Sequence, residues 1–152
     1  MCNRPDARAP LTGSVVHGAG RGRGLGFPTA NIAADPGSPV PPPAIYSGWF
    51  VRRSTGGVHR GTISIGSNPT FCDTTDVHIE VYCHDAAGEL YGERVVVWFV
   101  ERIRDTVKFS SVDALVRAAR QDVVRSDALL ASDRGQRVLA EIRTALRPAA
   151  SA

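Results

Sequence analysis

The sequence has almost no lysine. Of its 18 positively charged residues, only Lys108 is a lysine and the other 17 are arginines. The lysine-containing phosphate loop, Gly-x-x-x-x-Gly-Lys-Ser/Thr, is absent, and the glycines at 18, 20, 22, 24 and 26 do not fit the dinucleotide pattern Gly-x-Gly-x-x-Gly. If this protein binds phosphate, arginine, backbone N–H groups or a metal ion must hold it.

Other absences exclude further classes of protein. The three cysteines form no Cys-x-x-Cys pair, which argues against a disulfide framework and a zinc ribbon. No apolar run approaches the ~20 residues that cross a bilayer, and the N-terminus has no signal-like apolar segment, so we expect a cytoplasmic protein without a membrane partner. Aromatic residues make up 7% of the chain and the net charge is only +3, so we expect no nucleic-acid partner.

The chain is long enough for one domain with a real core. We expect a flexible tail over residues 1–10 and a single domain over residues 11–152. The proline-rich stretch Pro36–Pro43 predicts a loop, because proline lacks the N–H donor that regular structure needs. Six segments rich in β-branched and aromatic residues are predicted to be strands: Ser14–His17, Thr29–Ile32, Ile45–Arg52, Gly61–Ile65, Val77–Cys83 and Glu93–Val100.

Short strands joined by turn signals favour antiparallel pairing in a small barrel, over about residues 11–107. Gly56-Gly57 and Gly66–Pro69 are interpreted as such turns. Alternation within Val77–Cys83 predicts a core face of Val77, Ile79, Val81 and Cys83, and a polar face that carries His78, Glu80, Tyr82 and His84.

Helical periodicity follows, over about residues 110–147. Ser110 is the expected N-cap of a first helix, with a buried face of Val112, Leu115, Val116, Ala119 and Val123. A second helix is expected to begin near Ser132 or Asp133 and to end before Pro148. The predicted fold is therefore mainly β, a six-stranded antiparallel barrel with C-terminal helices.

The densest glycine region is Gly18–Gly26, which leads into Pro28, Thr29 and Asn31. Such a region is often only a flexible surface hairpin. Its glycines, however, let backbone N–H groups approach an anion, and Arg21 and Arg23 carry guanidinium groups suited to phosphate oxygens. Thr29 and Asn31 are two apart on an extended chain, so they project to one side with the oxygen ligands that Mg²⁺ accepts.

Two further residues have two interpretations each. Glu80 is either an exposed strand glutamate or, if its face lines a cleft, a general base for a substrate hydroxyl. Arg104 lies at the junction between the last strand and the first helix, where an arginine is usually solvated or packs against the helix.

Seven blocks, in order and at matching spacing over about Leu11–Val124, resemble the riboflavin kinase family. They are Gly13-Ser-Val-Val-His-Gly18, Gly24-Leu-Gly-Phe-Pro-Thr-Ala-Asn-Ile32, Ile45-Tyr-Ser-Gly-Trp49, Ser64-Ile-Gly-Ser-Asn-Pro-Thr-Phe71, Ile79-Glu-Val81, Leu90-Tyr-Gly92 and Arg102-Ile-Arg-Asp105 with Lys108-Phe109. The resemblance implies a Greek-key flavokinase barrel. It also implies a kinase that transfers phosphate from ATP, with Mg²⁺, to the ribityl 5′-hydroxyl of riboflavin, giving FMN and ADP.

The resemblance also implies roles for individual residues. Thr29 and Asn31 would hold the metal and the phosphates, Glu80 would be the base, and Arg104 would lie over the flavin. The glycine loop would cover the nucleotide phosphates, which involves Gly18, Arg21, Gly24 and Gly26. The block Gly66–Phe71 would lie near the nucleotide, which adds Asn68 to the expected nucleotide-binding residues.

The chain departs from the family pattern in three places. Tyr82 stands where a histidine is frequent, and Ala44-Ile45-Tyr46 stands where Gly-Val-Tyr is common. Bacterial members usually follow an FMN adenylyltransferase module, whereas about ten residues precede the kinase block here, so we expect no FAD synthesis. We expect a monomer acting on small molecules. Two alternatives stay open: a kinase of a flavin analogue or another polyol, and a non-catalytic flavin-binding or regulatory module.

Overall fold

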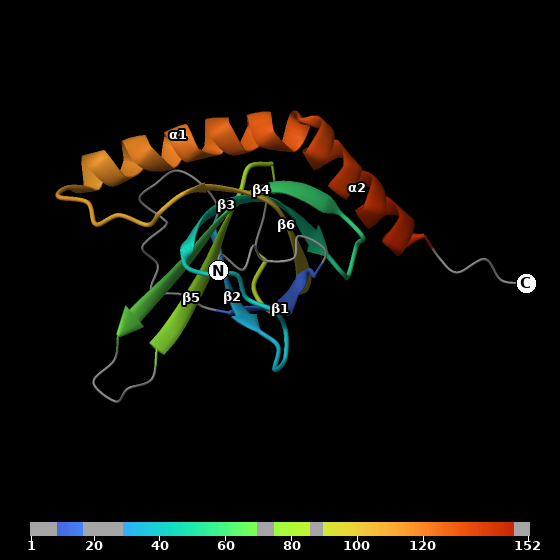
Figure 1. The fold of residues 1–152 in the computed structure, drawn as a ribbon. Helices are drawn as coiled ribbons and strands as arrows, with labels where there is room; N and C mark the ends of the chain where they lie inside the picture. The colour runs from blue at the N-terminus through green and yellow to red at the C-terminus, as the bar shows by residue number, and fades with distance from the viewer. Residues whose placement is uncertain (1–8, 17–28, 70–74, 86–89, 148–152) are drawn as a thin grey trace, which may run out of the picture.

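The computed structural model describes residues 9–16, 29–69, 75–85 and 90–147, and Figure 1 shows their arrangement. Six strands are followed by two helices along the chain. The strands are β1 (Leu11–Val16), β2 (Thr29–Ala34), β3 (Ala44–Arg52), β4 (Val58–Pro69), β5 (Thr75–Cys83) and β6 (Arg94–Arg104). The helices are α1 (Val112–Ala131) and α2 (Asp133–Leu146).

The strands form a closed barrel in the order β1-β2-β5-β4-β3-β6, and all pairs are antiparallel. β3, β4 and β5 follow one another as hairpins, and β6 returns to pair with β3, which is a Greek-key arrangement. The pairing of β1 with both β2 and β6 closes the sheet, so each of the described strands pairs with a neighbour on both sides over part of its length. The predicted six-stranded antiparallel barrel is confirmed.

Several strands are longer than their hydrophobic segments predicted. The Gly66–Pro69 segment, interpreted as a turn, belongs to β4, whose pairing with β5 continues from Gly61↔Cys83 to Pro69↔Thr75. The ladder tolerates Pro69 because it stands at the strand end, where a missing N–H costs little. Arg102–Arg104 likewise belongs to β6 and is not a connection to the helix.

The barrel interior is filled by alternate side chains from every strand. Phe50, Ile63 and Ile65 are fully buried there, and Ile79, Val81 and Cys83 of β5 point inward as predicted. Two predictions for β5 were wrong. Val77 is 47% exposed, because β5 there pairs only with the far end of β4, and Tyr82 on the outer face is buried beneath α1.

The two helices lie along one side of the barrel with a bend between them (Figure 1). The N-cap of α1 is Ser111 instead of Ser110, and its hydroxyl accepts a hydrogen bond from the Ala114 N–H at 3.1 Å. The buried positions of α1 are Ala119, Asp122, Ser126 and Leu130. Val112, predicted to be buried, is 69% exposed, so the buried face of α1 is more polar than its apolar residues indicated.

A second core joins α2 to the outer face of β3 and β6. Val138, Leu139 and Ile142 of α2 pack in one cluster with Trp49, Val51, Val100 and Leu130. The indole N–H of Trp49 donates to the carbonyl oxygen of Gly135 at 3.1 Å. As expected, Ser132 caps the start of α2. Neither helix in the described ranges is long and apolar enough to cross a membrane.

Candidate active site

The pairing of β2 with β5 brings Asn31 and Glu80 side by side. They are direct cross-strand partners, and Glu80 is also the partner of Ser64 on β4. Asn31 stands between the buried Ala30 and Ile32, so its side chain is on the outer face of the barrel. Side chains of direct cross-strand partners have Cβ atoms about 4.5–5.5 Å apart. An amide and a carboxylate therefore share one small patch of the outer surface.

The neighbouring cross-strand row contains Thr29, Tyr82 and Thr62. Thr29 is two residues from Asn31 on β2, so both project to the outer face, which places them on one side as the spacing predicted. Tyr82 packs against Ala119 of α1. Burial, together with the negative charges of Glu80 and Asp122, raises the pKa of Tyr82 to about 12. Tyr82 is thus a neutral phenol that packs against the helix in the row beside Asn31 and Glu80.

Arg104 lies at the other end of the row that contains Glu80. The register runs from Glu80 to Ser64, then to Ile45 of β3 and to Arg104, the last residue of β6. Three strand spacings of about 4.8 Å therefore lie between the backbones of Glu80 and Arg104, counted along the curved surface of the barrel.

The guanidinium of Arg104 is held by three groups. Nε and Nη2 donate to the two carboxylate oxygens of Asp122 at 2.8 and 2.7 Å, and Nη1 donates to the carbonyl oxygen of Asp105 at 2.9 Å. The ring of Phe109 lies 5.7 Å from the guanidinium carbon. The hydrogen bonds to Asp122 raise the pKa of Arg104. Arg104 therefore packs against the helix, which is one of the interpretations from sequence. The contact with a flavin that the family resemblance implies stays a prediction.

The sequence did not identify Asp122 as a partner of Arg104, although its position along the helix could have indicated it. Its spacing from Leu115 and Ala119 puts it on the buried face of α1, and a carboxylate that is only 5% exposed needs a cationic partner. Ser64 was not identified as a neighbour of Glu80, because their adjacency depends on the register between β4 and β5.

Five other expected site residues belong to the nucleotide end of the proposed site. Gly18, Arg21, Gly24 and Gly26 lie outside the described residues. The backbone of Asn68 belongs to β4 and pairs with Asp76 of β5, four residues along the strand from Ser64. At about 3.4 Å per residue, that places its backbone about 14 Å along the strand from the patch with Glu80.

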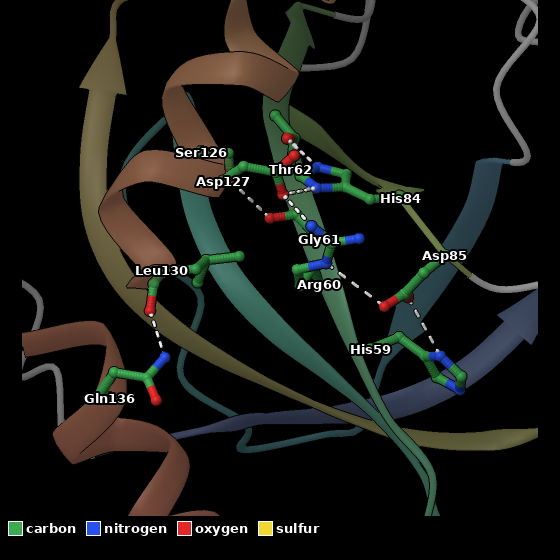
Figure 2. Close-up of polar contacts among 10 residues, drawn as sticks. All are labelled: His59, Arg60, Gly61, Thr62, His84, Asp85, Ser126, Asp127, Leu130 and Gln136. Carbon is green, nitrogen blue, oxygen red and sulfur yellow. Dashed lines mark hydrogen bonds and ion pairs between the residues drawn. The ribbon is translucent and has the colours of Figure 1, made fainter. Parts of the chain in front are cut away.

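A second polar cluster connects α1 to β4 and β5. Figure 2 shows the imidazole of His84 between Thr62 on β4 and Asp127 on α1. Nε2 lies 2.7 Å from the Thr62 hydroxyl and Nδ1 lies 2.6 Å from a carboxylate oxygen of Asp127, which also pairs with Arg60. The order hydroxyl, imidazole, carboxylate is that of a nucleophilic triad, but Thr62 is fully buried and no substrate can reach it. The cluster anchors the helix.

The residues on the outer face suit a magnesium site that relies on substrate. The Thr29 hydroxyl and the Asn31 amide are hard oxygen donors, and Mg²⁺ commonly takes only one or two protein ligands beside water and phosphate. Within the described part of the chain, no group of three or more His, Cys, Asp or Glu side chains could hold a metal. Thr29 and Asn31 would leave most coordination positions of a metal to water and substrate phosphate.

A search against protein families matches residues 7–130 to the family described as "Flavokinase: Riboflavin kinase". The chain belongs to the riboflavin kinase family. It is 39% identical over 110 residues to the bifunctional riboflavin kinase/FMN adenylyltransferase of Listeria monocytogenes, which covers 72% of this chain and 34% of that protein. It is 34% identical over 115 residues to the riboflavin kinase of Homo sapiens, which covers 73% of this chain and 74% of that protein.

Among solved structures, the riboflavin kinase from Trypanosoma brucei superposes with a TM-score of 0.64 at 26% identity, over 94% of this chain and 93% of that one. The chain thus spans about a third of the length of the bifunctional relative and about three quarters of the human one. The family assignment agrees with the motif resemblance and with the barrel.

Proposed function

We propose that this protein transfers the γ-phosphoryl group of ATP to the ribityl 5′-hydroxyl of riboflavin, giving FMN and ADP. The observation that carries the proposal is the cross-strand pair of Asn31 and Glu80 on the outer face of a barrel from the riboflavin kinase family. The pair combines a hard oxygen ligand with a carboxylate, which are the two functions that phosphoryl transfer to a hydroxyl needs.

In the proposed reaction the carboxylate of Glu80 accepts the proton of the 5′-hydroxyl while that oxygen attacks the γ-phosphorus. The bond from the γ-phosphorus to the bridging oxygen breaks, and ADP leaves. The transition state has little covalent character for a protein to supply, so the strands contribute mainly by holding base and ligands in fixed positions. Thr29 and Asn31 would hold Mg²⁺, which offsets the negative charge of the phosphates.

The remaining roles follow the family. Gly18, Arg21, Gly24, Gly26 and Asn68 are proposed to contact the nucleotide. Arg104 is proposed to lie at the flavin end of the acceptor. Its place three strands from Glu80 along the register supports this, because riboflavin carries its hydroxyl at the opposite end from its ring system. We further propose a cytoplasmic monomer that acts on small molecules.

Two substitutions test the proposed site. Glu80→Gln removes the base at constant size, and we expect turnover of riboflavin to fall by about 10²–10⁴-fold. Asn31→Ala removes the metal ligand, and we expect a similar loss that higher Mg²⁺ concentrations partly restore. Glu101→Gln, an exposed glutamate on β6, is the matched control and should turn over like the wild type.

The measurement is FMN formation, followed by chromatography of the flavins, with melting temperatures recorded for each variant. Wild-type rates for both Glu80→Gln and Asn31→Ala would refute the site. Phosphorylation of other polyols as readily as riboflavin would indicate a different acceptor. Flavin binding without nucleotide consumption by the wild type would indicate a non-catalytic module.

A further inference from the structure

The buried face of α1 carries a carboxylate where packing alone would favour an apolar side chain. Asp122 is 5% exposed and follows Ala119 by one helical turn. Both of its oxygens accept hydrogen bonds from Arg104 on β6. A buried ion pair is weak evidence for stability, because the cost of removing two charges from water offsets much of their attraction. The pair therefore calls for an explanation other than holding the helix in place.

Other contacts already hold α1 against the barrel. The hydroxyl of Ser126 donates to the carbonyl oxygen of Gly61 at 2.9 Å, and Asp127 is bonded to His84 at 2.6 Å, as Figure 2 shows. These contacts lie one to two turns further along the helix and do not involve Arg104. What the Asp122 pair adds is a fixed position for the guanidinium.

The position of Arg104 in turn orders the start of the β6–α1 connection. Its Nη1 donates to the carbonyl oxygen of Asp105, and its guanidinium lies over the ring of Phe109. Three of its five N–H groups are thereby used, and two N–H groups have no partner among the residues that the structure describes. The side chain remains 26% exposed, so these two donors can meet a ligand.

We propose that Asp122 is a positioning residue for the acceptor, which acts through Arg104. Asp122 fixes the orientation of the Arg104 guanidinium. The two remaining N–H groups, together with Asp105 and Phe109, then form the end of the site that lies three strands from Glu80. The ligand is the ring system of the acceptor, whose carbonyl groups accept hydrogen bonds. This inference rests on the proposed function, since it deepens the acceptor side of the same site.

The test compares Asp122→Asn with a matched control on the same helix. Asp122→Asn keeps the size of the side chain but removes the charge, so Arg104 loses its bidentate anchor. Asp127→Asn removes an ion pair between α1 and the barrel at His84 and Arg60 and leaves Arg104 untouched. The measured quantities are the KM for riboflavin, the KM for ATP, kcat, and riboflavin affinity by quenching of flavin fluorescence.

For Asp122→Asn we expect the KM and the dissociation constant for riboflavin to rise at least about tenfold, which corresponds to the loss of a charge-assisted hydrogen bond. The KM for ATP should stay within about twofold. Asp127→Asn should change none of these values by more than about twofold, even if its melting temperature falls. An unchanged riboflavin KM in Asp122→Asn, or an equal rise in both variants, would refute the positioning role.

A double substitution covers the case in which Asp122→Asn does not fold. Arg104→Met with Asp122→Leu replaces the ion pair by apolar side chains of similar size, an exchange that proteins often tolerate. If Asp122 acts through Arg104, the double variant folds and has the same raised riboflavin KM as Arg104→Met alone, because Asp122 has nothing left to position. A wild-type KM in the folded double variant would show that the pair is only structural.

Failure of the proposed function gives a different result. In that case the wild type itself neither binds nor phosphorylates riboflavin, whereas failure of the positioning role leaves an active wild type and an unaffected Asp122→Asn variant.

Discussion

Gly135→Ala is the substitution for which the structure predicts the opposite of the usual effect. In the interior of an exposed helix, alanine is more stable than glycine by about 1 kcal/mol. Gly135 lies in the first turn of α2, where the helix starts directly against the end of α1. A Cβ atom there would stand 2.2 Å from the carbonyl oxygen of Leu130 and 2.5 Å from that of Leu129. We therefore expect the alanine variant to be destabilised.

The two carbonyl groups cannot turn away, because each already accepts a hydrogen bond at the corner. Leu130 accepts from the Gln136 side chain at 3.0 Å, and Leu129 accepts from the backbone N–H of Ser132 at 3.2 Å. To reach an ordinary contact distance, α2 must move outward by about 1 Å, which weakens dispersion contacts by about a quarter to a half.

The loss of packing around α2 sets the size of the destabilisation by Gly135→Ala. Val138, Leu139 and Ile142 are the buried side chains of α2, and burying each one fully is worth about 1.5–3 kcal/mol. A quarter to a half of that total is about 1–4.5 kcal/mol. A lengthened bond between Trp49 and Gly135 adds about 1 kcal/mol, which the helix propensity of alanine offsets, so the net destabilisation is about 3 kcal/mol at the middle of this range. At this chain length the melting temperature should fall by about 6–12 °C.

Urea unfolding followed by circular dichroism measures the free energy of unfolding directly. Ala140→Gly, at an exposed position of the same helix, is the control, because it reports helix propensity alone and should cost about 1 kcal/mol. The reasoning about the helix corner is refuted if Gly135→Ala is as stable as the wild type or more stable.

Two further predictions concern titratable groups. Burial raises the pKa of the Cys83 thiol to about 12, so in a Cys2→Ser/Cys72→Ser variant a thiol reagent at pH 8 should label Cys83 only after denaturation; fast labelling of the native protein would contradict its burial. The hydrogen bond from Arg94 lowers the pKa of Asp35 from 3.8 to about 2. Because this folded value lies below the unfolded one, the pair stabilises the protein above about pH 4 and the contribution disappears as the pH falls through about 2, whereas a midpoint near 3.8 by NMR would contradict the pairing.

The barrel was predictable from sequence because alternation reports burial directly. Ile79, Val81 and Cys83 point inward as their period of two requires. The strand ends were not predictable, since pairing with a neighbour extends β4 through Gly66–Pro69 regardless of its turn-like composition. The alternation along β5 puts Val77 on the same face as the buried Ile79. Val77 is nevertheless exposed, because it lies on the part of the β4–β5 hairpin beyond the pairing with β2.

The first helix shows why a hydrophobic pattern can give the wrong face. Apolar spacing selected Val112, whereas the structure buries Asp122 and Ser126. Both polar side chains find partners on the barrel, in Arg104 and in the carbonyl oxygen of Gly61. A pattern that counts only apolar residues cannot predict such partners, because they belong to strands that are distant in sequence.

The candidate site was predictable in its residue types more than in its geometry. The spacing of Thr29 and Asn31 was sufficient to place both on one side of β2. That Asn31 lies beside Glu80 depends on pairing between β2 and β5, which are separated by two other strands along the chain. That Arg104 is anchored by Asp122 depends on how α1 crosses β6.

The central claim is that this protein makes FMN by phosphoryl transfer from ATP. The most direct measurement is incubation of the purified chain with riboflavin, Mg²⁺ and ATP labelled at the γ-phosphate, followed by separation of the flavins. The account predicts that the label appears in FMN, that FMN and ADP form in equal amounts, and that omission of Mg²⁺ abolishes the product. Riboflavin recovered unlabelled, beside wild-type protein that is folded by circular dichroism, would contradict it.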